Sequence, residues 1–146
     1  MDDADAIAII ARELLHEPAR NSMSDGYSTI LRDHFENPRN VGALDAPDAV
    51  GFAENPASGA TLSLHLAIKD GVIDRALFRA QGCAATIASG SVLTEWMVGK
   101  TPVQACKIAR ADIETGLGGL PPTRKHAADL AVDAVHNALG KLARQT

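Results

Sequence analysis

One short segment restricts the fold more than any other part of this chain. Over residues 61–69, apolar residues alternate with polar or small ones, the apolar set being Leu62, Leu64, Leu66 and Ile68. A period of two is typical of a strand with one buried face. The pair Asp70-Gly71 follows and favours a tight hairpin turn. Residues 72–80 are therefore predicted to return as the partner strand.

Helical patterns follow the hairpin. Residues 84–98 are apolar or small nearly all round, which predicts a helix buried against the sheet. Shorter helices are expected over 102–110 and 112–117, and a last one over 125–143, with an inner face of Ala127, Leu130, Ala131, Ala134, Ala138 and Leu142. Residues 49–53 fit an edge strand. Strands followed by helices predict an α+β fold, a small antiparallel sheet of about three strands with helices packed on one face.

The N-terminal part suggests two units. Residues 3–17 carry Ile7, Ile10, Ala11, Leu14 and Leu15 at helical spacing, and Pro18 ends the pattern. A second helix is predicted over 27–35. We expect residues 1–22 to be a helical extension with a linker, and residues 23–146 to be the folded domain.

Composition and charge exclude several classes of function. The 146 residues are 46% hydrophobic and 22% charged but contain few aromatics, so Ala, Leu, Ile and Val must build the core. A net charge of −4 without a basic run argues against nucleic acid, and the longest uncharged stretch is too short and polar to span a membrane. The acidic N-terminus lacks a secretory signal. We expect a cytoplasmic protein with two free thiols, Cys83 and Cys106, and place Cys106 in the core.

Cys83 is the first candidate for chemistry, because it lies where the second strand ends and the buried helix begins. The positive end of a helix dipole favours thiolate, the form that binds metals or attacks electrophiles. The alternative is a small buried residue at a strand-to-helix corner.

His126 is the second candidate, in the first turn of the last helix. The helix dipole there disfavours imidazolium, so the ring would tend to be neutral and able to ligate. Asp129 and Asp133 follow at helical spacing and could hold the ring, although a solvated polar face is the alternative. Before this helix, Leu120-Pro121-Pro122 could be a partner-binding segment or a rigid entry to the helix.

Several segments together resemble the IscU/NifU-type family of iron–sulfur scaffolds. They cover roughly residues 27–144, in order and with family-like spacing: Tyr27-Ser28, Asp33-His34-Phe35-Glu36-Asn37-Pro38-Arg39-Asn40-Val41-Gly42, Pro56-Ala57-Ser58-Gly59-Ala60, Gln81-Gly82-Cys83-Ala84-Ala85-Thr86 and Leu120-Pro121-Pro122-Thr123-Arg124-Lys125-His126-Ala127. The resemblance implies a non-enzymatic protein that assembles a [2Fe–2S] cluster and passes it on. It also implies a cysteine desulfurase and an Hsp70-type chaperone as partners, the chaperone gripping the Leu-Pro-Pro segment.

The same resemblance implies an incomplete set of ligands. The family site has three Cys, an Asp and a His, of which Cys83 and His126 carry over as candidate ligands of iron, zinc or a cluster. The other positions hold Ser58 for the first Cys, Ala60 for the Asp and Ala127 for the third Cys. A [2Fe–2S] cluster is normally held by four side chains, mostly thiolates, and structural zinc also takes four ligands.

Three functions remain open at this point. The chain could be a divergent scaffold or carrier that holds iron or a [2Fe–2S] cluster weakly, with missing ligands from a second subunit, a thiol cofactor or a client. It could instead be a non-catalytic binding module that has lost cluster assembly and still contacts desulfurase or chaperone. A thiol enzyme using Cys83 ranks last, because nothing in the sequence supplies an oxyanion hole or a substrate pocket.

Overall fold

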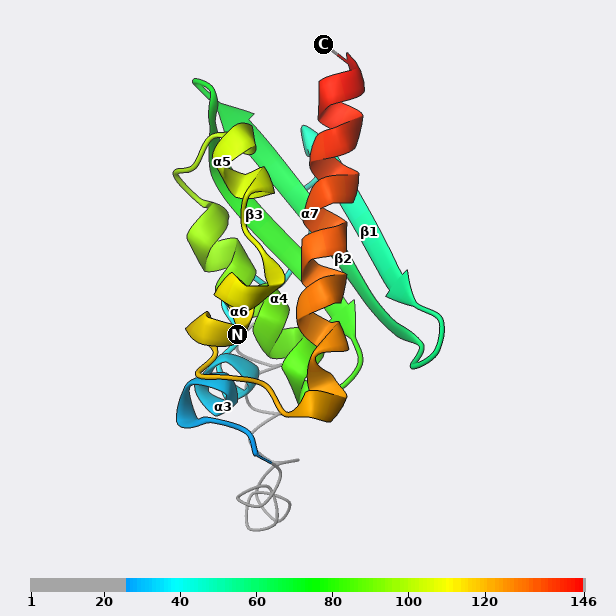
Figure 1. Cartoon of the computed structure of the whole chain (residues 1–146). Helices are drawn as coiled ribbons and strands as arrows, with labels where there is room; N and C mark the ends of the chain where they lie inside the picture. The colour runs from blue at the N-terminus through cyan, green and yellow to red at the C-terminus, as the bar shows by residue number, and fades with distance from the viewer. Residues whose placement is uncertain (1–25, 146) are drawn as a thin grey trace.

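The computed structural model describes residues 26–145, so the helix predicted over 3–17 and its linker lie outside the described residues. Three antiparallel strands form one sheet in the order β1-β2-β3. The main helices lie on one face of that sheet (Figure 1), which confirms the predicted α+β class. The elements in chain order are α3 (Thr29–Glu36), β1 (Ala49–Asn55), β2 (Ala60–Lys69), β3 (Val72–Gln81), α4 (Ala84–Met97), α5 (Pro102–Cys106), α6 (Arg110–Gly116), the 3-10 helix η1 (Pro122–Arg124) and α7 (His126–Gln145).

The predicted hairpin is confirmed. Asp70 and Gly71 both take positive φ, 54° and 80°, as the tight turn between β2 and β3 requires. The alternating leucines of β2 are all fully buried. Strand β1 continues two residues beyond its predicted end, because its pairing with β2 extends to Asn55 opposite Ala60.

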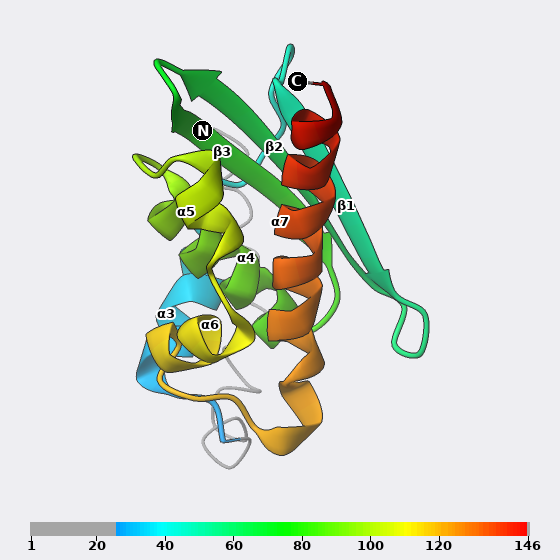
Figure 2. The ribbon, with the colours of Figure 1, turned by 45° about the horizontal axis from the view of Figure 1, so that its top comes forward.

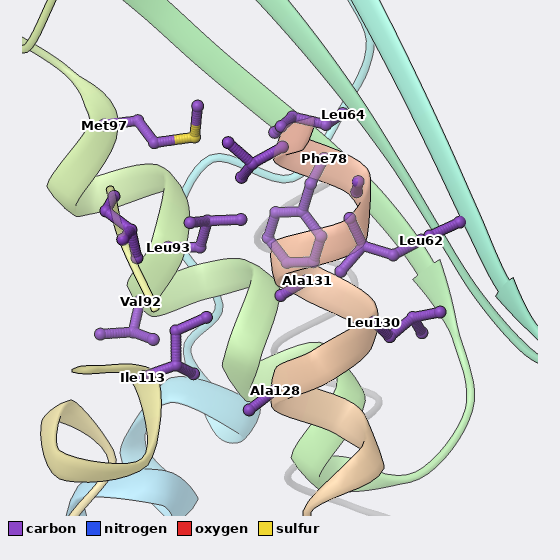
Figure 3. Packing of buried hydrophobic residues seen from close by; sticks show 14 of the residues in the cluster. Leu62, Leu64, Phe78, Val92, Leu93, Met97, Ile113, Ala128, Leu130 and Ala131 are labelled. Atoms are coloured by element: carbon purple, nitrogen blue, oxygen red, sulfur yellow. The ribbon is translucent and has the colours of Figure 1, made fainter. Parts of the chain in front are cut away.

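The core lies between the sheet and two helices, with α7 over β1 and β2 and α4 against β3 (Figure 2). Leu62 and Phe78 project from the sheet toward Leu93 of α4 and Ala131 of α7 (Figure 3). Small residues let these layers approach closely. A Cβ atom placed on Gly51 of β1 would lie 2.1 Å from the Ala134 carbonyl oxygen of α7.

The prediction for residues 102–117 was partly wrong. Two separate short helices form there as predicted, α5 and α6, but α5 ends at Cys106 instead of residue 110. Helix α6 begins after Ala109, whose N–H donates a hydrogen bond to the Asp112 carboxylate at 2.8 Å and so caps the start of the helix. Cys106 is exposed, not in the core as predicted, since the short α5 turns Ala105 inward instead.

Strand β1 is the edge of the sheet next to α7. The Phe52 N–H, on that strand, donates a hydrogen bond to the Asn137 side-chain oxygen of α7 at 2.9 Å. A side chain of the covering helix therefore satisfies a backbone donor of the edge strand.

A buried polar cluster joins α3 to α4. His34 is 7% exposed, and its Nδ1 lies 2.8 Å from the hydroxyl of the fully buried Ser91. That hydroxyl accepts a hydrogen bond from the Arg39 N–H at 3.0 Å. His34 Nε2 lies 3.6 Å from a Glu95 carboxylate oxygen. If Ser91 donates its own proton to Nδ1, the imidazole is neutral and its Nε2–H faces the Glu95 carboxylate.

We predict that this cluster makes stability depend on pH. Burial, followed by the nearby Arg39 charge, lowers the pKa of His34 below its ordinary 6.5, although Glu95 and Asp33 act the other way. The unfolded chain therefore binds the proton more readily, and stability present above pH 6.5 is lost as the pH falls below it. Urea denaturation between about pH 7 and pH 5 should show this loss, and His34→Gln should flatten it.

The matched control for that measurement is His136→Gln, at an exposed histidine of α7, which should keep the wild-type slope. The pKa of Asp33 is itself lowered from 3.8, chiefly by its hydrogen bond to Arg39, so Asp33 titrates below this pH window. An unchanged slope in His34→Gln would contradict the assignment.

We also predict that Gly51→Ala loosens the contact between α7 and β1. The added methyl group would overlap the backbone of α7, so the free energy of unfolding should fall by about 1–3 kcal/mol. Glu54→Ala, at an exposed position of the same strand, should change it by about 0.5 kcal/mol or less. Equal free energies of unfolding for the two variants in urea denaturation would contradict the prediction, because they would mean that α7 shifts to accommodate the methyl group without loss of stability.

Candidate functional site

Cys83 lies where the sequence predicted it, between the end of β3 and the start of α4. It is the N-cap residue of α4, with extended backbone, and its side chain caps no backbone N–H. The side chain is half-buried against the edge of the core, and both Cys83 and Cys106 are free thiols. The thiol is thus held at the positive end of a helix.

Gly82 shapes the chain beside this thiol. Its φ of +151° is one that a residue with a side chain rarely adopts. A Cβ atom there would lie 2.8 Å from the Thr86 hydroxyl and 3.1 Å from the Ala60 methyl group. Gly82 therefore lets the corner before α4 pack directly against the first residue of β2.

Ser58 lies in the tight turn between β1 and β2 and is exposed. Its hydroxyl accepts a hydrogen bond from the Ala60 N–H at 3.2 Å, and the Asn55 side chain accepts from the N–H groups of Ala57 and Ser58. These bonds are those of a self-supporting turn. Ala60, two residues later, is only 3% exposed.

His126 is the first residue of α7, as predicted, and is half-buried. It lines a pocket of about 300 Å³ between α7 and the end of β1, together with Glu54, Asn55, Pro56, Asp129, Leu130 and Asp133. Asp129 pairs with Arg110 at 3.5 Å, not with the imidazole as the spacing suggested. Ala127 follows His126 and is fully buried.

The five positions that the family resemblance marks therefore lie at one end of the sheet. The β1–β2 turn, the end of β3 with the start of α4, and the start of α7 all lie at this end (Figure 1). Two of the five residues, Cys83 and His126, carry a group that can ligate a metal. Across residues 26–145, no three side chains of His, Cys, Asp or Glu gather closely enough to hold a metal ion.

The Leu120-Pro121-Pro122 segment lies close to the same end, beside the start of α3. A Cβ atom on Gly26 would lie 3.4 Å from the Pro121 ring, and the Arg124 guanidinium donates to the Tyr27 hydroxyl at 3.2 Å. Leu120 and Pro121 are half-buried whereas Pro122 is exposed. The segment ends in the 3-10 helix η1, which begins at Pro122.

Sequence reasoning missed one residue near the thiol. Thr86 is fully buried, and its hydroxyl lies 3.6 Å from Cys83 Sγ. A hydroxyl three residues after a cysteine at a helix start lies one turn along the same face. That spacing was the available signal.

We predict that restoring a carboxylate at residue 60 destabilises the fold. Ala60→Asp would bury a charge beside Gly82, so the free energy of unfolding should fall by about 1–3 kcal/mol at neutral pH. Protonation of the new carboxyl should recover part of that loss in acid. Ala57→Asp, exposed in the same turn, is the control. Equal urea midpoints for the two variants would contradict the prediction.

None of the helices within residues 26–145 has both the length and the apolar character to cross a membrane. The fold is similar to that of a nitrogen-fixing NifU-like protein (N-terminal) from Brucella abortus. The TM-score is 0.68 at 22% identity, covering 85% of this chain and 99% of that one. A putative SUF-system scaffold from Fervidobacterium islandicum aligns with a TM-score of 0.66 at 21% identity, covering 77% and 96%. At these identities, the two structures support the fold alone.

Sequence relatives are closer. The chain is 42% identical over 113 residues to the iron–sulfur cluster assembly scaffold protein IscU 1 of Archaeoglobus fulgidus, covering 77% of this chain and 74% of that protein. It is 41% identical over 117 residues to the IscU scaffold of Haemophilus influenzae, covering 77% and 92%. Residues 26–146 match the family described as the NifU-like N terminal domain. The chain therefore belongs to the NifU/IscU scaffold family.

Proposed function

We propose that this protein works in iron–sulfur cluster assembly as a divergent, non-enzymatic scaffold or carrier. Family membership over nearly the whole described chain supports this proposal most strongly. The cargo would be iron or a [2Fe–2S] cluster. Cys83 and His126 would be the protein's own ligands, since a thiolate and a neutral imidazole both bind iron.

A single copy supplies only half of the usual four ligands. Ser58 is neutral unless deprotonated, and the methyl groups of Ala60 and Ala127 cannot ligate. The remaining positions would be filled from outside, by a second copy, a thiol cofactor or the client that receives the cluster. Binding would then be weak in the isolated protein and stronger when the second source of ligands is present.

The partner proposals follow from the family. The relatives are named as assembly scaffolds, and a scaffold must receive sulfur and release its cargo. We expect a cysteine desulfurase and an Hsp70-type chaperone as partners, in the cytoplasm, with exposed Pro122 at the chaperone contact. Persulfide uptake at residue 127 is impossible, because alanine has no sulfur.

A second candidate function has its own support. The methyl groups of Ala60 and Ala127 pack into the core, so two family ligand positions now serve packing alone. A binding module that contacts assembly partners without holding a cluster would have this character. It differs from the scaffold in one measurable property, which is whether Cys83 and His126 bind metal.

Anaerobic reconstitution with ferrous iron and sulfide separates the two functions. We predict that the wild type retains iron and sulfide, at less than one cluster per chain, and that Cys83→Ala retains none. The variant S58C/A60D/A127C restores the family's ligands. Once urea denaturation establishes that it folds despite the buried carboxylate, it should bind a full cluster, which verifies the assay. Adding a thiol such as glutathione should raise wild-type loading.

Metal analysis with absorbance spectra gives the readout. If the wild type retains no more iron than Cys83→Ala, while the restored variant loads normally, the scaffold function fails and the binding module is favoured. Capture of purified desulfurase or chaperone by the wild type would then test the module directly.

A further inference from the structure

A buried hydroxyl is directed at the thiol of the proposed site. Thr86 lies in the first turn of α4, fully buried, with its Oγ1 3.6 Å from Cys83 Sγ. Gly82 makes room for this arrangement, because a side chain at residue 82 would collide with the same Oγ1 at 2.8 Å. The pairing thus depends on two features of the corner, a missing side chain and a buried hydroxyl.

The direction of this hydrogen bond depends on the state of the sulfur. A thiol can donate to the threonine oxygen or accept from it. A thiolate has no proton, so it can only accept, and the threonine hydroxyl must then be the donor. The ligating form of Cys83 therefore fixes Thr86 as donor. Groups that donate to a ligand in this way hold its orientation and tune the metal.

We infer that Thr86 is a positioning residue for Cys83. Its hydroxyl donates to the ligating sulfur and holds the side chain in one rotamer, ready for metal. The inference rests on the proposed function, since it assigns Thr86 to a sulfur that binds iron. It matters more here than in a site with all its ligands, because a metal held by two protein side chains relies on each being correctly oriented.

Three variants of the full chain test the inference. Thr86→Val keeps the shape of the side chain and removes the hydroxyl, whereas Thr86→Ser keeps the hydroxyl. Ser89→Ala is the matched control. Ser89 is another fully buried hydroxyl of α4, three residues further on, and its Oγ has no hydrogen-bond partner within the described structure. Urea denaturation first establishes that all three fold.

The first measurement needs no metal. NMR three-bond couplings to the Cys83 β-protons report how many rotamers the side chain samples. We expect one rotamer in the wild type, Thr86→Ser and Ser89→Ala, and averaging in Thr86→Val. Cys106, exposed on α5, serves as an internal reference that should not change. An unaveraged Cys83 in Thr86→Val would overturn the inference.

The second measurement is titration with Co²⁺ alone, followed by the absorbance of the sulfur–cobalt bond. We expect affinity to fall about tenfold in Thr86→Val, as for other groups that support a ligand, and to stay unchanged in Thr86→Ser and Ser89→Ala. Equal affinity in all variants would overturn the inference. Absence of Co²⁺ binding by the wild type would count against the proposed function, whereas the rotamer measurement would still decide the role of Thr86.

Discussion

The close approach of α7 to the sheet is the contact on which the rest of the structure depends. Helix α7 and strand β1 approach so closely at Gly51 that the position has room for a hydrogen atom but not for the Cβ atom of any other residue. Alanines on the inner face of α7 extend this contact along the helix, where Ala127, Ala131, Ala134 and Ala138 are fully buried. A chain with few aromatic residues gains its packing density through such proximity instead of through large side chains. His126 is placed at the β1–β2 end because α7 begins there.

The elements that could be predicted from sequence are those whose signal is local. The leucine alternation of β2 and the Asp70-Gly71 turn determined the hairpin, and the apolar run after Cys83 marked a buried helix. Predictions were inaccurate where a side-chain cap sets the bounds of a helix or where a helix is too short for periodicity to show. The break between α5 and α6 depends on Asp112 capping Ala109. The resulting one-turn helix leaves Cys106 facing solvent.

The candidate site was predicted in part, for a similar reason. The positions of Cys83 before a buried helix and of His126 at the start of the last helix follow from local sequence, and the structure places both there. Their common location at one end of the sheet could be expected only from the family resemblance, because the number of residues between them does not determine their distance in space. The cluster of His34, Ser91 and Glu95 was not predicted, since residues 34 and 91 meet only after α3 packs on α4. The hydroxyl of Thr86 likewise gains significance only once its burial is known.

The hydrogen bond between Asn137 and the Phe52 N–H has a consequence for how this protein behaves at high concentration. An outer strand with free backbone donors is a template on which another chain can add a strand, and growth of that kind ends in aggregates. The amide side chain of α7 occupies one such donor in the middle of β1. The sheet therefore resists extension at that point. An outer strand closed by its own helix in this way is a poor template for other chains, which lowers the tendency of the protein to polymerise.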